Sequence, residues 1–186
     1  MNKYINTIIF SLIMVLMLGL SQRITQCEKT ISNLQNEEKI ILLQVKDNEN
    51  INKKQTKQID NIDLIMNKYS KQFGVDKNLI KAISIVESGG RHNVTSNSGA
   101  IGIMQLTPST AKNMGVNPYN VDDNIKGATK YLAYLQKKYD GNQDLVIAGY
   151  NAGEGNVSKH KGVPSFSRKY VDTVKRHKQN LECMKK

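Results

Sequence analysis

Hydrophobic and polar residues follow three patterns along the chain, and each pattern predicts a different kind of segment. Residues 4–22 form an uncharged, mostly apolar run. Residues 24–59 are rich in Asn, Gln, Lys and Glu and contain neither Gly nor Pro. From residue 60 on, apolar side chains recur every three or four positions, which is the period of an amphipathic helix. The chain is therefore expected to comprise a hydrophobic segment (1–23), a polar stalk (24–59) and a folded domain (60–186).

The apolar run near the N-terminus indicates membrane targeting. Lys3 places a positive charge before it, and residues 8–18 are continuously apolar apart from Ser11. A membrane-spanning helix needs roughly 20 such residues, so this run is just long enough. Residues 19–22 lack the small-residue pattern of a cleavage site. We therefore favour an uncleaved signal-anchor over a cleaved signal peptide or lipidation at Cys27, and all three alternatives export the rest of the chain.

The polar segment is predicted to form a helical or partly disordered stalk that holds the domain away from the membrane. Several of its apolar residues fall at spacings of three or four, but Glu38, Asn48 and Asn52 interrupt the series. A coiled coil needs three or four sustained heptads. The sequence therefore favours a stalk over a specific dimerisation helix.

The folded domain is predicted to be all-α or mostly α. Its helices are expected to begin at capping residues and to end at glycines. The expected starts are Asp76, Thr107-Pro108, Asp122 or Asp123, Asp144 and Ser167, and the expected ends include Gly74, Gly89-Gly90 and Gly153. Alternating strand patterns are scarce, and only residues 97–106 suit a small β-excursion.

The charge distribution and the cysteine content limit the kinds of binding partner and scaffold that the chain can have. The formal charge is +11, and residues 159–186 alone hold nine basic and two acidic side chains. Such a tail suits a polyanion, whether nucleic acid, anionic lipid or cell-wall polymer. The body from 60 to 158 carries ten basic and nine acidic residues, which weakens any prediction of a basic groove through the domain. Two cysteines exclude a disulfide-rich scaffold, although Cys27 and Cys183 could pair in an oxidising compartment.

Glu87 is the first candidate for chemistry. It falls at the end of the helix that starts after Asp76, on the face it shares with Ile80 and Ile83. Partial burial and the negative end of the helix dipole both disfavour the ionised carboxylate, so they raise its pKa. A carboxyl group with a raised pKa can serve as a general acid near neutral pH. The competing interpretation is a surface Glu that pairs with Arg91 four positions on.

Two further clusters are weak signals by themselves. The segment Ser98-Gly99-Ala100-Ile101-Gly102-Ile103-Met104-Gln105 suggests backbone that passes close to a ligand, although glycines also serve a loop's own turns. The segment Ala148-Gly149-Tyr150-Asn151-Ala152-Gly153 places a phenol and an amide beside small residues at a helix end. Both groups can bind sugars, and both can also cap helices.

In this order and spacing, the motifs resemble a known family. Glu87-Ser88-Gly89-Gly90, Gly99 to Gln105 and Gly149 to Gly153 are similar to the motifs of the soluble-type lytic transglycosylases. The resemblance runs from about residue 60 to about residue 175 and includes the Thr107-Pro108 helix start. It implies a lysozyme-like, goose-type helical domain, preceded here by the hydrophobic anchor and the polar stalk.

The resemblance also implies an activity and site residues. Members of this family cleave the β-1,4 bond between N-acetylmuramic acid and N-acetylglucosamine in peptidoglycan, and they leave a 1,6-anhydromuramyl end without consuming water. Glu87 matches the family's single general acid and base, and the substrate's own N-acetyl group removes the need for a second carboxylate. No cofactor is expected. Tyr150 is expected to orient Glu87. The other positions expected to contact the glycan are Ser96 or Ser98, Met104, Gln105, Asn151 and Tyr170.

The chain departs from the family at one motif, and it lacks a pattern of metal-binding residues. Many relatives have Glu-Thr before the final Tyr-Val helix, whereas this chain has Phe166-Ser167, so the hydroxyl is kept and the carboxylate is lost. The three histidines are scattered and the cysteines lie outside the motifs, so we expect no metal.

We therefore expect an exported enzyme, anchored in the membrane facing the periplasm or cell wall, or secreted, that acts on peptidoglycan glycan strands. The alternatives are a hydrolytic muramidase on the same fold and a non-catalytic cell-wall binding module. A nucleic-acid binder built on the basic tail is disfavoured by the export segment. Service to a secretion or conjugation machine is an analogy from size and architecture alone.

Overall fold

A computed structural model of the chain describes residues 2–184. The chain divides into two compact units, Met1–Lys57 and Gln58–Lys186. The first residue and the last two, which belong to the predicted anchor and the predicted domain, lie outside the described residues.

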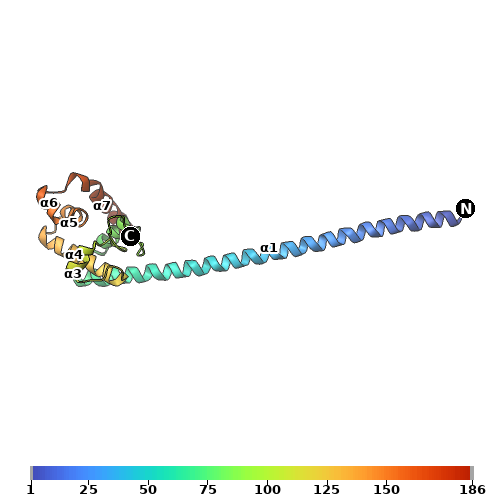
Figure 1. Cartoon of the computed structure of the whole chain (residues 1–186), viewed down its shortest axis with the longest axis horizontal. Helices are drawn as coiled ribbons and strands as arrows, with labels where there is room; N and C mark the ends of the chain where they lie inside the picture. The colour runs from blue at the N-terminus through green and yellow to red at the C-terminus, as the bar shows by residue number, and fades with distance from the viewer. Residues whose placement is uncertain (1, 185–186) are drawn as a thin grey trace. The chain divides into compact units, whose positions relative to one another are not determined.

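The first unit consists of one helix. Helix α1 spans Asn2–Phe73, so its last turns belong to the second unit (Figure 1). Within the first unit, residues 4–57 are all exposed. The N-terminal part of α1 is long and apolar enough to cross a membrane, as judged by length and composition. Residues 24–57 of the predicted stalk are helical throughout.

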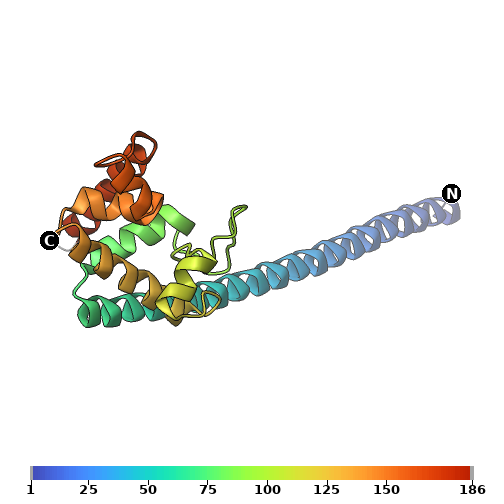
Figure 2. The same cartoon turned by 60° about the vertical axis from the view of Figure 1, so that its left-hand side comes forward.

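The second unit is helical. It contains the end of α1 and six further α-helices, which are α2 (Lys77–Ser88), α3 (Pro108–Met114), α4 (Val121–Lys138), α5 (Gln143–Ala152), α6 (Glu154–Lys159) and α7 (Arg168–Cys183), with a short 3₁₀ turn, η1 (Ser165–Ser167), before α7. Figures 1 and 2 show α3 and α4 on one side of this unit and α5, α6 and the start of α7 on the other. Residues 2–184 contain no strand, and the predicted β-excursion is reduced to two isolated bridges that join Ile101 to Thr95 and to Leu106.

Several of the predicted helix ends are confirmed. Asp76 caps α2 by accepting a hydrogen bond from the Asn78 backbone N–H, and Gly89 ends the helix in the left-handed conformation. Thr107 caps α3, and Pro108 is its first residue.

Three predicted helix starts need correction. Asn120 caps α4 and Asn142 caps α5, whereas Asp122, Asp123 and Asp144 lie inside the first turns. Acidic residues are favoured in the first turn by the positive end of the helix dipole. The sequence pattern therefore located the first turns of α4 and α5 correctly but assigned the wrong capping residues. Ser167 precedes α7, but its side chain makes no capping hydrogen bond, because it bonds elsewhere.

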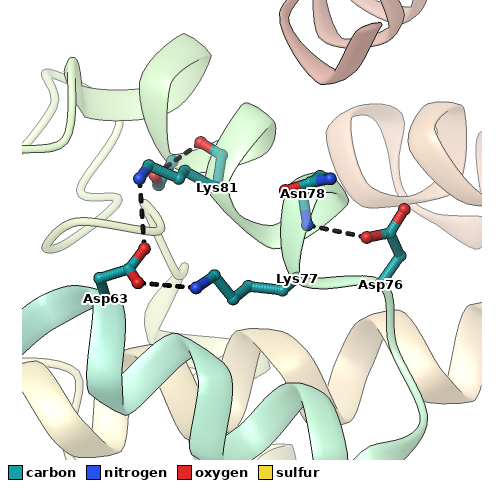
Figure 3. Close-up of polar contacts among 6 residues, drawn as sticks. Asp63, Asp76, Lys77, Asn78 and Lys81 are labelled. Carbon is teal, nitrogen blue, oxygen red and sulfur yellow. Dashed lines mark hydrogen bonds and ion pairs between the residues drawn. The ribbon is translucent and has the colours of Figure 1, made fainter. Parts of the chain in front are cut away.

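The core lies between α2 and the helices around it. Ile80 and Ile83 on α2 are fully buried, and α2 packs against α7. Ion pairs fix the start of α2 to its neighbours: Asp63 of α1 lies between Lys77 and Lys81, with N–O distances of 2.6 and 3.2 Å (Figure 3). Lys178 of α7 lies 3.0 Å from Asp76. These contacts link the start of α2 to α1 and α7.

Candidate active site

The centre of the candidate site is a hydrogen bond between Glu87 and Tyr170. Glu87 lies half-buried in the last turn of α2, and Tyr170 lies in the first turn of α7. The Tyr170 hydroxyl donates to Glu87 Oε1 at a distance of 2.5 Å. Because α2 and α7 pack against each other, the two groups are brought together by the core of the domain.

The environment of Glu87 favours its protonated form. Burial raises the pKa of the carboxyl group above its usual value, and the hydrogen bond from Tyr170 opposes this only in part. Burial also raises the pKa values of the Tyr150 and Tyr170 hydroxyls well above the usual value, and the nearby charge of Glu87 adds to the effect. Both phenols therefore stay protonated and act as hydrogen-bond donors at neutral pH.

Ser88, the residue after Glu87, attaches the loop between α2 and α3 (residues 89–107) to α2. Its side chain is buried, and its hydroxyl hydrogen-bonds the Ile103 carbonyl at 2.8 Å and the Ser84 carbonyl at 3.1 Å. Sequence reasoning quoted Ser88 in a motif without giving it a function. Its position next to Glu87 is the signal that could have identified it.

Asn124 holds the same loop from the other side. Its side chain is fully buried, accepts the Met104 backbone N–H at 2.9 Å, and donates to the Ile101 and Pro118 carbonyls, each at 2.9 Å. Gly102 has a φ of +80°, and a Cβ there would come within 2.5 Å of Asn124 Nδ2. The glycine is therefore required by both the backbone conformation and the close approach of Asn124. Sequence reasoning did not assign Asn124 to the site.

Met104 and Gln105 shape the loop from within. The Met104 side chain is fully buried, so it cannot present its thioether to a ligand. Its carbonyl accepts a 2.7 Å hydrogen bond from the Tyr150 hydroxyl. Gln105 has a φ of +48°, and its amide donates to the Gly102 and Val94 carbonyls at 2.9 and 3.2 Å. Both side chains stabilise the loop.

Ser96 and Ser98 lie at the tip of this loop. The Ser96 hydroxyl accepts the Ala100 backbone N–H at 3.0 Å and lies 3.0 Å from the Ser98 hydroxyl. Ser98 is exposed and Ser96 is half-buried. Of the two, Ser98 is therefore the more accessible to a ligand.

Tyr150 and Asn151 lie in the last turn of helix α5. Tyr150 was expected to orient Glu87, but its hydroxyl donates to Met104, and the hydrogen bond to Glu87 comes from Tyr170. Asn151 is exposed, and its Oδ1 accepts a 2.7 Å hydrogen bond from the buried Ser167 hydroxyl. The structure thus joins Glu87 to Tyr170, Tyr150 to the loop, and Asn151 to the start of α7.

Four acids that follow Glu87 in the chain could be considered as a second carboxylate, and each has partners other than Glu87. Asp122 accepts from Tyr69 and Lys68, Asp123 accepts the Asn117 backbone N–H, Asp144 pairs with Lys175, and Glu154 pairs with Lys138 and Tyr134. The geometry therefore presents one carboxyl group in a distinctive environment. Among residues 2–184, no cluster of three or more His, Cys, Asp or Glu side chains is arranged to hold a metal ion. Both cysteines are exposed, free thiols.

Sequence comparison relates the chain to known proteins. The family model described as "Transglycosylase SLT domain" matches residues 65–172. A transglycosylase from Enterobacteria phage PRD1 is 31% identical over 106 residues, which cover 56% of this chain and 40% of that protein. The membrane-bound lytic murein transglycosylase F of Pseudomonas fluorescens (strain Pf0-1) is 38% identical over 96 residues, 48% of this chain and 20% of that protein. The chain thus spans less than half the length of these relatives.

Solved structures agree with the sequence comparison. The 70 kDa soluble lytic transglycosylase from Escherichia coli matches with a TM-score of 0.57 and 26% identity, over 61% of this chain and 23% of that one. A complex of the 70-kDa enzyme with bulgecin A matches with a TM-score of 0.61 and 25% identity, over 64% and 24%. The mostly α, lysozyme-like fold predicted from the sequence is confirmed. Because the family model covers more than half of the chain, this protein belongs to the transglycosylase SLT domain family.

Proposed function

We propose that the protein is a peptidoglycan lytic transglycosylase that cleaves the β-1,4 bond between N-acetylmuramic acid and N-acetylglucosamine without water. The family assignment supports a lytic murein transglycosylase, and the site supports the chemistry. The observation that carries the proposal is the half-buried carboxyl of Glu87, whose pKa is raised by burial and whose Oε1 accepts a hydrogen bond from Tyr170.

In this mechanism one carboxyl group performs both proton transfers. Protonated Glu87 donates its proton to the glycosidic oxygen as the bond from the muramic acid C1 to that oxygen breaks. The neighbouring N-acetyl group stabilises the positive charge that develops at C1. The Glu87 carboxylate then takes the proton of the C6 hydroxyl as that oxygen bonds to C1. The products are a free N-acetylglucosamine hydroxyl and a 1,6-anhydro ring, and Glu87 ends protonated, ready for the next cycle.

The surroundings of Glu87 suit this double role. A general acid that must also act as a base works best with a pKa near the working pH. Burial raises the pKa of Glu87 above its usual value, and the Tyr170 hydroxyl donates to the carboxylate once the proton has left. Ordinary glycosidases use two carboxylates at a defined separation. The separate pairing of Asp122, Asp144 and Glu154 supports the single-carboxylate route.

Product analysis tests the reaction type. The full chain, solubilised in detergent, is incubated with purified peptidoglycan, and the released muropeptides are analysed by mass spectrometry. We expect 1,6-anhydromuramyl ends, which are 18 mass units lighter than hydrolysed ends because no water is added. Reducing N-acetylmuramic acid ends would instead establish a hydrolytic muramidase and refute the lyase proposal.

Variants test the role of Glu87. Glu87→Gln keeps the shape of the side chain and removes the transferable proton, so we expect activity to fall by at least about 10³-fold, at the level of a lost acid–base group. Glu182→Gln, an exposed glutamate that pairs with Lys178 on α7, is the matched control and should retain activity. Undiminished lysis by a folded Glu87→Gln variant would favour the non-catalytic binding module.

We further propose that the enzyme is exported and held at the membrane by the apolar part of α1, with the SLT domain on the wall side. The helix's length and apolar composition support this, as does the relative named a membrane-bound enzyme. The exposed thiols of Cys27 and Cys183 provide a test. A membrane-impermeant maleimide should label both in intact spheroplasts, and protection of Cys183 until lysis would place the domain inside the cell.

A further inference from the structure

The start of α7 contacts two different parts of the candidate site. Ser167 and Tyr170 are three residues apart, and residues at this spacing lie on the same side of a helix. Tyr170 reaches Glu87 at the end of α2, and Ser167 reaches Asn151 at the end of α5. One short segment therefore sets the positions of two site residues that come from different helices.

Ser167 does not cap helix α7, although a serine at its position ordinarily would. It is the residue before α7, where a serine side chain commonly caps the helix by accepting a backbone N–H. Here its conformation is helical, with φ −92° and ψ −10°, and the side chain makes no capping bond. The residue is fully buried, and its hydroxyl donates to Asn151 Oδ1 at 2.7 Å. The buried Ser167 hydroxyl thus hydrogen-bonds Asn151 and not the backbone of α7.

In this arrangement the bond occupies the oxygen end of the Asn151 amide. An asparagine side chain has one carbonyl oxygen that accepts and one NH₂ group that donates. The oxygen is occupied by a buried donor, while Asn151 itself is exposed. The amide is therefore held with its NH₂ group as the part available to a ligand.

We propose that Ser167 is a positioning residue that holds Asn151 as a hydrogen-bond donor to an acceptor oxygen of the glycan, most simply the carbonyl of an acetamido group. This inference rests on the proposed function and adds the polarity of the Asn151 contact and its dependence on Ser167. It also gives the hydroxyl before α7 a role in the site in place of capping. A flipped amide would offer an oxygen to the sugar carbonyl, which repels it.

Three single variants and one double variant test the proposal in the full chain, with a soluble peptidoglycan tetrasaccharide as substrate. Asn151→Asp keeps the oxygen that Ser167 bonds and replaces the NH₂ group with a second acceptor. We expect kcat/KM to fall by about tenfold or more, mainly through KM, with little change in melting temperature. Wild-type kcat/KM in Asn151→Asp would overturn the proposal, and this variant does not depend on any change at the buried serine.

The double variant separates positioning from general stability. Ser167→Ala should lower kcat/KM about tenfold in the wild-type background and have no further effect on kcat/KM in the Asn151→Ala background, because the amide it positions is absent. An equal loss in both backgrounds would show that Ser167 acts through the fold and would overturn the proposal. Glu87→Gln is measured in parallel. An inactive wild type would overturn both proposals, whereas an active wild type with additive Ser167 and Asn151 effects would overturn this one alone.

Discussion

The Asn124→Ala variant tests whether one buried side chain holds the loop of the site. Asn124 accepts the backbone N–H of Met104 and donates to the carbonyls of Ile101 and Pro118. Alanine removes all three hydrogen bonds. The Met104 N–H is then left buried without a partner. The Ile101 carbonyl keeps the hydrogen bond from the Leu106 N–H, and Pro118 is only half-buried and can be hydrated.

The expected loss of stability follows from those groups. A buried donor without a partner costs about 1–3 kcal/mol, and each of the other two lost hydrogen bonds costs about 1 kcal/mol, so the total is about 4 kcal/mol. For a chain of this length, 1 kcal/mol shifts the melting temperature by about 2–4 °C. We therefore expect Asn124→Ala to lower the melting temperature by roughly 8–16 °C. Activity measured below the new melting temperature should also fall, because the Met104 carbonyl accepts from Tyr150.

Thermal unfolding followed by circular dichroism, on the detergent-solubilised full chain, measures this effect. The matched control is Asn120→Ala, which removes a helix cap at an exposed asparagine four residues away and should cost only about 1 kcal/mol. A melting temperature for Asn124→Ala no lower than that of Asn120→Ala would refute the argument that Asn124 holds the loop.

Three further predictions concern pH. Tyr170→Phe removes the hydrogen bond that opposes the burial of Glu87, so the pKa of Glu87 should rise further and the alkaline limb of the kcat/KM profile should move to higher pH; an unmoved limb would contradict the assigned pairing. Because burial raises the folded-state pKa of Glu87, wild-type stability falls as pH rises through that pKa. Glu87→Gln should therefore melt higher than the wild type at pH 8 but not at pH 4, and a constant difference would count against a buried carboxylate. Burial raises the pKa of Asp63, but hydrogen bonds from Lys77 and Lys81 outweigh this effect and lower the pKa. The ion pairs of Asp63 therefore stabilise the fold above the usual Asp pKa, and this stabilisation is lost as pH falls through the lowered pKa. Asp63→Asn should thus destabilise by no more than about 1 kcal/mol at pH 7 and less in acid, and a larger loss in acid would refute the ion-pair account.

The sequence predicted the parts of the site that depend on local pattern. The end of α2 at Gly89 and the start of α3 at Thr107 follow from capping chemistry that neighbouring residues determine. The half-buried position of Glu87 follows from its register with Ile80 and Ile83. Family resemblance then selected the same glutamate.

The remaining contacts could not be predicted because they join residues far apart in the chain. The sequence offers eight tyrosines, and nothing local indicates that Tyr170 rather than Tyr150 donates to Glu87. The Ser167–Asn151 bond could not be predicted either, because a serine that precedes a helix ordinarily caps that helix. The caps of α4 and α5 were misplaced because Asn and Asp are both good caps, so composition alone cannot rank adjacent candidates.

The dependence of the site on α7 has a consequence for biosynthesis. Helix α7 is the last helix of the described chain, and it supplies Tyr170 while the preceding residue, Ser167, supplies the bond to Asn151. A nascent chain that has been translocated only as far as α6 contains Glu87 but lacks the groups that hold Glu87 and Asn151 in place. In a chain exported as proposed above, wall-cleaving activity should therefore arise only after α7 has been translocated, so the order of synthesis itself keeps a chain without α7 inactive.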